Sequence, residues 1–271
     1  MIDFRPHTEP LPITALLAAK LRDYAQLAKM RLSLTVVFSA GLGYLIAFQG
    51  AFETGTFLAL LAGGFLITAA ANATNELLEV EQDSVMSRTR NRPLPAGRMG
   101  RAEAITFTAL AVVAATLLFF LGTNPLTAII GLVSYLLYAF LYTPLKRVGP
   151  IAVFVGAIPG ALPPAIGAVA AAGELTTLAA LLFILQFFWQ FPHFWAIAWL
   201  GHEDYAKAGY RLLPSNLHPS RLNAAHLFSY TLMLVLASML PIAYEFARPL
   251  AGYLLAGLGL GFVVMAGGLF F

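Results

Sequence analysis

Long apolar runs without charged side chains follow one another through most of the chain. Each run has about the 20 residues that a helix needs to cross the hydrocarbon core of a bilayer. The runs must be helical, because strand edges in lipid would leave backbone groups without hydrogen bonds. We predict eight membrane-spanning helices, located in residues 32–52, 54–75, 104–145 (two spans), 148–173, 175–202, 222–244 and 249–271.

The run over residues 104–145 is twice the length of one span, so it must turn near its middle. Gly122-Thr123-Asn124-Pro125 supplies the turn, since glycine and proline interrupt a helix. The fold class that follows is an all-α membrane protein, a polytopic bundle of about eight transmembrane helices.

Composition supports a membrane domain and excludes several other classes of protein. Hydrophobic residues make up 59% of the 271 residues and charged residues only 11%. A soluble domain carries about 25% charged residues, so a soluble enzyme, a disordered tail and a nucleic-acid-binding module are excluded. The absence of cysteine excludes disulfides, thiolate zinc sites and a cysteine nucleophile. We expect one membrane domain over residues 32–271.

The N-terminal segment, residues 1–31, has no uncharged apolar run that would serve as a cleavable signal. Its acidic residues also distinguish it from a mitochondrial presequence. The basic residues of this segment fit a helix that lies at the membrane surface before the first span; they include Lys20, Arg22, Lys29 and Arg31.

The positive charges predict the orientation of the chain in the membrane. With the N-terminus inside, the inner segments are 1–31, 76–103, 144–148 and 203–221, and they hold 15 of the 16 basic residues. Only Arg248 lies outside. Both termini are therefore expected to be cytoplasmic. The second and sixth spans each end inside with acidic and then basic residues, which indicates a parallel repeat of four spans.

A stripe of polar residues marks the inner end of the second span. If the helix continues to Asp83, a rotation of about 100° per residue places five side chains on one face and Glu81 on the opposite face. The five are Asn72, Asn75, Glu76, Glu79 and Asp83. Clustered carboxylates repel one another, and a bound Mg²⁺ would relieve the repulsion. A solvated helix end is the alternative interpretation.

Arginines follow this stripe in a loop shaped by Pro93, Pro95 and Gly97. Arginine binds phosphate through two hydrogen bonds, although positive residues also anchor any membrane protein at its inner face. Beside the carboxylate stripe, Arg88 and Arg92 favour a metal–diphosphate site. At the end of the fourth span, Lys146 and Arg147 either contact the same diphosphate or extend to lipid headgroups.

The fifth and sixth spans contain residues that are unusual in a membrane helix. Glycines and prolines between Gly149 and Gly167 predict a kinked, closely packed helix. His193 lies in an apolar run of the sixth span and is either a functional residue or a hydrogen-bonded packing residue. The sixth span ends inside with Glu203 and Asp204.

Together these motifs resemble the intramembrane prenyltransferases of the UbiA superfamily, and within it the branch that farnesylates heme. The resemblance covers about residues 25–245 and rests on the following segments: Asn75-x-x-x-Glu79-x-x-x-Asp83, Met86 to Leu94, Tyr142 to Arg147, Gly156 to Gly167, Pro192-His193-Phe194 and Asp204-Tyr205-x-x-Ala208-Gly209. The combination is specific, whereas each motif alone is not. It implies a helical bundle around a central cavity that opens laterally to lipid.

The resemblance also implies a function and roles for residues. It implies Mg²⁺-dependent farnesyl transfer from farnesyl diphosphate to a heme b vinyl group, with addition of water. The implied catalytic residues are Asn75, Glu79, Asp83, Lys146 and Asp204. The implied metal ligands are Asn75, Glu79, Asp83, Glu203 and Asp204. Diphosphate binding is assigned to Arg88, Arg92, Lys146 and Arg147, and heme binding to His193.

The implied location is the bacterial plasma membrane, and the candidate protein partners are heme a synthase and a terminal-oxidase assembly factor. Nucleic acid is not an expected partner. The chain departs from the family pattern at Glu79, where the superfamily usually has Asp, and in its span count, which is usually nine. His193 stands where many relatives that use phenolic acceptors carry Asp.

Two other functions are compatible with parts of this pattern. A UbiA-type prenyltransferase with a quinone-precursor or chlorophyll-type acceptor would share the diphosphate half of the site. A transporter or cation channel would keep ionisable residues near the bilayer midplane, whereas here they cluster at one face.

Overall fold

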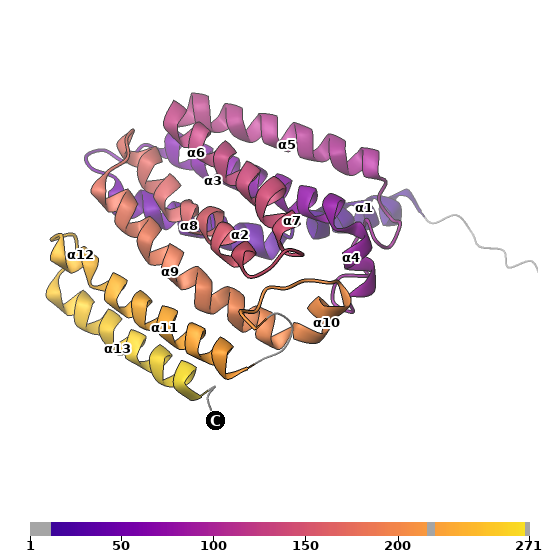
Figure 1. Cartoon of the computed structure of the whole chain (residues 1–271). Coiled ribbons are helices and arrows are strands. Elements are labelled where there is room, and N and C mark those ends of the chain that lie inside the picture. Colours follow the sequence, from indigo (N-terminus) through magenta and orange to yellow (C-terminus); the bar gives the residue numbers. More distant parts are fainter. Residues whose placement is uncertain (1–11, 216–219, 269–271) are drawn as a thin grey trace, which may run out of the picture.

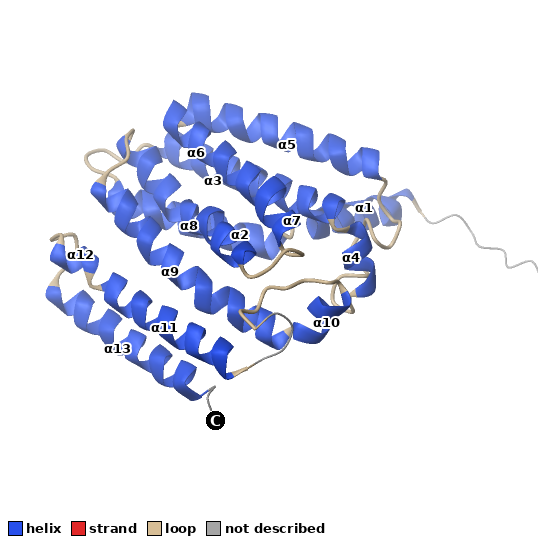
Figure 2. Ribbon diagram, viewed as in Figure 1, coloured by secondary structure: helices blue, strands red, loops and turns tan. Residues whose placement is uncertain are grey.

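The computed structural model describes residues 12–215 and 220–268, and within these ranges it contains helices and connecting loops but no strand (Figure 2). The elements are α1 (Ile13–Leu27), α2 (Met30–Ala47), α3 (Thr54–Leu78), α4 (Val80–Val85), α5 (Arg101–Gly122), α6 (Pro125–Leu136), the π-helix η1 (Leu137–Tyr142), α7 (Thr143–Leu145), α8 (Ile151–Ala172), α9 (Thr177–Leu200), α10 (His202–Lys207), α11 (Arg221–Ser238), α12 (Leu240–Ala243) and α13 (Pro249–Gly267).

Among the described residues, 8 helices are long and apolar enough to cross a membrane, as the sequence predicts. The elements α6, η1 and α7 together form one of them, and α11 continues through α12. The predicted break in the longest apolar run is confirmed, since α5 ends at Gly122 and α6 begins at Pro125. The side chain of Asn124 caps α6 by accepting a hydrogen bond from the Thr127 N–H at 2.9 Å.

The long helices pack in a connected series (Figure 1). Helix α3 packs against α5, α5 against α6, and α6 against α8, while α2 packs against both α3 and α8. Helix α9 packs on the other side of α8, followed by α11 and then α13. The contact between α2 and α8 is close because Gly43 and Gly167 leave room for the backbone of the facing helix.

Prolines inside α8 leave carbonyl groups without their usual helical partner. Pro164 has no N–H for the carbonyl of Gly160, and the Gln190 side chain of α9 donates to that oxygen at 3.0 Å. A side chain at Gly160 would overlap Gln190. The predicted tight packing of this breaker-rich span is therefore confirmed, and it ties α8 directly to α9.

The second span does not run unbroken to Asp83, so the assumption used to place the acidic stripe does not hold. Helix α3 ends at Leu78, and Glu79 leaves the helical conformation with φ −114° and ψ 19° before α4 begins. The backbone hydrogen bonds from Glu79 N–H to Asn75 and from Asp83 N–H to Glu79 are nevertheless kept. Periodicity alone cannot detect a one-residue break that preserves the hydrogen-bond spacing.

Short helices follow the second and sixth spans at the same end of the molecule. Helix α4 follows α3, α10 follows α9, and α4 and α10 contact each other (Figure 1). Helix α1 lies close to this end and exposes Ile13, Leu17 and Leu21. An exposed apolar face fits the predicted helix at the membrane surface, which stays a prediction.

Candidate active site

The five residues of the acidic stripe are buried in spite of the break at Glu79, while Glu81 is exposed. Burial of all five is compatible with the predicted common face, which stays a prediction. The buried residues are Asn72, Asn75, Glu76, Glu79 and Asp83. Buried carboxylates need compensating charge, which here comes from other elements of the fold.

Lys146, which follows α7, supplies the charge that compensates Glu79. Its Nζ atom lies 2.9 Å from Glu79 Oε2, and the Asn75 amide donates to the same oxygen at 2.6 Å. The Lys146 ammonium also lies over two aromatic rings, 4.9 Å from the centroid of Tyr142 and 5.5 Å from that of Tyr210. The end of the fourth span thus meets the acidic stripe of the second, as the candidate site requires.

Arg92 from the loop after α4 pairs with the other two carboxylates. Its Nη1 atom lies 2.7 Å from Asp83 Oδ2, and its Nε atom lies 3.6 Å from Glu76 Oε1. Neither oxygen of Glu76 has a hydrogen-bond partner among the described residues, and the same is true of Glu79 Oε1. Buried acceptor oxygens therefore remain available at the centre of the cluster.

These free oxygens suit a hard cation. Mg²⁺ is usually held by one or two carboxylates and completes its shell with water and phosphate oxygens. Among the described residues, no three acidic, histidine or cysteine side chains converge to enclose a metal. A cation at Glu79 and Asp83 would therefore take only part of its shell from these side chains.

Asp204 of α10 reaches the arginine loop rather than the carboxylate stripe. It accepts a hydrogen bond from the Ser87 hydroxyl at 2.6 Å and pairs with Lys207 at 3.2 Å. The Ser87 and Lys207 hydrogen bonds lower the pKa of Asp204 to about 2. Next to it, Arg88 lies over the Tyr205 ring, 5.7 Å from its centroid, and donates to the Tyr205 hydroxyl at 3.3 Å.

The structure does not bring every predicted site residue into the cluster. Glu203 is exposed, although it directly precedes Asp204, whose side chain accepts from Ser87. The prediction that it contributes to the carboxylate cluster is not supported by this position. Arg147 is also exposed, beside the buried Lys146.

Lys29 also belongs to this cluster, although the sequence did not indicate it. It was predicted to lie at the membrane surface, yet its Nζ atom donates to Asn75 Oδ1 at 3.0 Å. Burial, together with the nearby cations of Arg92 and Lys146, lowers the pKa of Lys29 to about 7. The described neighbours therefore do not fully compensate its positive charge.

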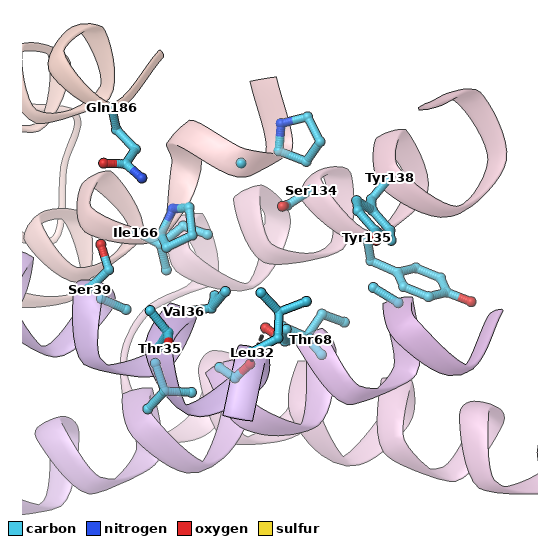
Figure 3. A pocket seen from close by; sticks show the side chains of 18 of the residues that line it. Leu32, Thr35, Val36, Ser39, Thr68, Ser134, Tyr135, Tyr138, Ile166 and Gln186 are labelled. Atoms are coloured by element: carbon cyan, nitrogen blue, oxygen red, sulfur yellow. Dashed lines mark hydrogen bonds between the residues drawn. The ribbon is translucent and has the colours of Figure 1, made fainter. Parts of the chain in front are cut away.

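A cavity of about 430 Å³ lies among α2, α3, α6, η1, α8 and α9. Leu32, Thr35, Val36 and Ser39 of α2 line one side, and Ser134 and Tyr138 line another (Figure 3). Asn72 lines the cavity as well, so the cavity reaches towards the inner end of α3.

His193 of α9 also lines this cavity. Its ring stacks on Trp189, with ring centroids 4.4 Å apart, and no hydrogen bond to it occurs among the described residues. The alternative of a packing histidine held by a hydrogen bond is therefore not supported. Gln186 and Gln190 line the same side, so the wall formed by α9 is partly polar.

Sequence reasoning missed several neighbours of the site. Ser87 contacts Asp204, Thr143 accepts from the Asn75 amide at 3.2 Å, and Tyr210 lies against Lys146. The position of Thr143 close to Lys146 in the sequence was a usable signal, whereas Tyr210 lies far from Lys146 along the chain. Lys29 gave no such signal, because it precedes the first span and its contact depends on tertiary packing.

Comparisons with known proteins identify the family of the chain. The sequence model of the UbiA prenyltransferase family matches residues 36–270. Protoheme IX farnesyltransferase from Cytophaga hutchinsonii is 42% identical over 246 residues, which cover 91% of this chain and 86% of that protein. The mitochondrial protoheme IX farnesyltransferase of Homo sapiens is 39% identical over 218 residues, which cover 80% of this chain and 49% of that protein.

Solved structures share the fold at lower sequence identity. A digeranylgeranylglyceryl phosphate synthase superposes with a TM-score of 0.77 at 21% identity, covering 93% of this chain and 88% of that one. A UbiA homolog from Archaeoglobus fulgidus bound to DMAPP and Mg²⁺ gives a TM-score of 0.71 at 15% identity, covering 90% of this chain and 86% of that one.

Proposed function

Because this chain belongs to the UbiA prenyltransferase family, we propose that it transfers the farnesyl group of farnesyl diphosphate to a vinyl group of heme b. Water adds to the same vinyl group, and the product is heme o. One observation carries the proposal: two buried carboxylate–cation pairs, Glu79 with Lys146 and Asp83 with Arg92, follow the inner end of α3. The same helix lines a largely apolar cavity of about 430 Å³ with Asn72. The named relatives supply the choice of acceptor.

The charged cluster binds the diphosphate group in this proposal. Asn75, Glu79 and Asp83, together with Asp204 of α10, would hold Mg²⁺, and the ion would supply positive charge to the diphosphate oxygens. Lys146 and Arg92 exchange their carboxylate partners for phosphate oxygens. A second set of cations, Arg88 and Arg147, lies at the rim of the site. A diphosphate needs both the oxygen ligands of its metal ion and cations for its own oxygens. This requirement explains why buried charges of both signs lie close together here.

The reaction breaks the bond between C1 of the farnesyl group and the diphosphate oxygen. The bonding electrons leave with the diphosphate, where Lys146 and Arg92 stabilise the added charge. The allylic cation is attacked by the electrons of the heme vinyl group, which forms the new carbon–carbon bond. Water then adds to the resulting cation and loses a proton, which leaves a hydroxyethylfarnesyl side chain.

The cavity excludes water from the farnesyl group until the carbon–carbon bond has formed. An allylic cation in contact with bulk water would be hydrolysed, so the largely apolar lining of the cavity is part of the mechanism. The volume lies in the usual range of ligand sites, about 300–1,000 Å³.

We assign acceptor binding to the wall formed by α9. His193 exposes its ring to the cavity, and Trp189 fixes the orientation of that ring by stacking. An imidazole in this position can bind heme iron or face the macrocycle. The His193→Ala variant should retain farnesyl diphosphate binding and lose most of its use of heme. Equal loss of both would assign His193 a structural role instead.

Analysis of heme extracted from expressing cells tests the proposed acceptor. The wild-type chain should yield farnesylated heme in a host that lacks its own enzyme, and the Asp83→Asn variant should not. A wild-type chain that makes no farnesylated heme but prenylates 4-hydroxybenzoate would overturn the choice of heme.

The same proposal places the active site at the cytoplasmic face of a bacterial plasma membrane, with both termini inside. The concentration of basic residues at the loops around α4 and α10 supports this orientation. Reporter fusions at the two termini should both be active only in the cytoplasm. Heme a synthase and terminal-oxidase assembly factors are the proposed recipients of the product.

A further inference from the structure

The junction between α1 and α2 has an unusual backbone. Lys29 adopts φ 45° and ψ 57°, in the left-handed region that residues other than glycine rarely occupy. Such conformations persist only where the surrounding structure enforces them, and they often occur at functional sites. The conformation ends α1 and starts α2 in the space of two residues.

Two buried side chains hold this junction in place. The carbonyl of Ala28 accepts hydrogen bonds from the Ser33 hydroxyl at 2.6 Å and from the Asn72 amide at 3.3 Å. Asn72 also donates to the Ser33 hydroxyl at 3.2 Å. Ser33 and Asn72 are both buried, so the three hydrogen bonds connect the junction to α3 in the interior. Asn72 therefore serves the junction rather than the carboxylate cluster.

The Lys29 ammonium points from this junction to the centre of the site. It donates to Asn75 Oδ1 at 3.0 Å, and Asn75 in turn donates to Glu79. Lys146 and Arg92 each have a carboxylate within ion-pair distance, whereas no ion pair of Lys29 occurs among the described residues. An ammonium has three donors, and the described hydrogen bond uses one.

We infer that Lys29 is a further diphosphate-binding residue, positioned by the Ser33–Asn72 hydrogen bonds at the α1–α2 junction. The inference rests on the proposed function and deepens it. Lys29, Lys146 and Arg92 come from three separate segments and contact neighbouring residues of one cluster. A diphosphate bound next to Asn75 would give the unpaired ammonium its anion, and lysine suits phosphate as a compact point charge.

A different role for Lys29 makes a different prediction. If the ammonium only offsets the negative charge of Glu76, its removal should destabilise the protein without ligand and leave diphosphate affinity unchanged. If it binds diphosphate, its removal should weaken binding and leave the stability of the unliganded protein nearly unchanged.

The test measures binding of inorganic pyrophosphate with Mg²⁺ to the full-length chain in nanodiscs by calorimetry. Lys29→Met should weaken binding about tenfold, as expected for one lost charge-assisted hydrogen bond. The melting temperature without ligand should stay within about 2 °C of wild type. Lys29→Arg should bind more tightly than Lys29→Met. Lys20→Met is the matched control, because Lys20 pairs with Glu103 on the surface, and its affinity should equal that of wild type.

Ser33→Ala provides a second and milder test. It removes the hydroxyl that holds Ala28 but keeps the ammonium, so affinity should fall about threefold. Affinity of Lys29→Met within twofold of wild type would overturn the inference. If Lys29→Met does not fold, unchanged affinity of Ser33→Ala would overturn it. Failure of the wild-type chain to bind pyrophosphate or farnesyl diphosphate at all would instead contradict the proposed function.

Discussion

The two acidic helix ends of this protein occupy very different environments. At the end of α3 and in α4, Glu79 and Asp83 are buried and each faces a cation from another segment. In α10, Asp204 is partly exposed and Glu203 is exposed. The difference indicates that the first end provides most of the binding free energy for a charged ligand. Electrostatic interactions are stronger where water is excluded.

The sequence alone would treat the two ends as equivalent parts of a repeat. Both follow a span, both carry carboxylates, and both are followed by basic residues. The structure separates them by their contacts. The first end faces η1 and Lys146, whereas the second contacts the loop that begins at Ser87. Substitutions at each end can therefore compare how much the two ends contribute to turnover and to substrate binding.

The largest effect is expected from the Asp83→Asn variant. The amide keeps the shape of the side chain but loses the charge that faces Arg92 and a bound metal. Turnover should fall at least about 100-fold, as when a main electrostatic contact of a transition state is removed. Farnesylated heme formed by purified protein is the measurement. Turnover within a few-fold of wild type would show that Asp83 is not a metal ligand.

A large effect on substrate binding is expected from Lys146→Ala. The change removes a phosphate ligand and leaves Glu79 buried without its cation. We expect the KM for farnesyl diphosphate to rise about tenfold, the cost of one charge-assisted contact. Lys207→Ala is the matched control, because Lys207 pairs with Asp204 on the exposed helix end. Equal KM values for the two variants would contradict the proposed difference between the ends.

A smaller effect is expected from Asp204→Asn. The variant loses the charge that orients Ser87 and Lys207, so turnover should fall about three- to tenfold. A loss as large as that of Asp83→Asn would show that the ends contribute equally. The two variants should be compared at one concentration of MgCl₂ and farnesyl diphosphate.

The pH dependence of stability sharpens the same comparison. The folded-state pKa of Asp204 is lowered to about 2, so its contribution to stability is present above the unfolded-state value of about 3.9. The contribution is lost as the pH falls towards 2. The difference in melting temperature between wild type and Asp204→Asn should therefore be constant from pH 5 to 8. A difference that changes across this interval would contradict the assigned pKa.

The smallest effect is expected from Glu203→Gln. Because Glu203 is exposed and makes no described ion pair, turnover should stay within about twofold of wild type. A loss comparable to that of Asp204→Asn would restore Glu203 to the metal site that the family resemblance implies.

The amino-acid sequence by itself determined the spans and the acidic stripe. Uncharged runs of membrane length must be helical, and a period of 3.6 residues places Asn75, Glu79 and Asp83 on one face whatever surrounds them. The break at Glu79 did not disturb this result, because the backbone hydrogen bonds on either side keep their spacing.

Only the tertiary structure decided which charges meet. Lys29 and Lys146 lie far apart in the chain and converge on Asn75 and Glu79 because α2, α3 and α7 pack together. The exposure of Glu203 beside the paired Asp204 was decided in the same way. Local spacing specifies the face of one helix, but the partner of a charged side chain depends on distances between helices, which packing sets.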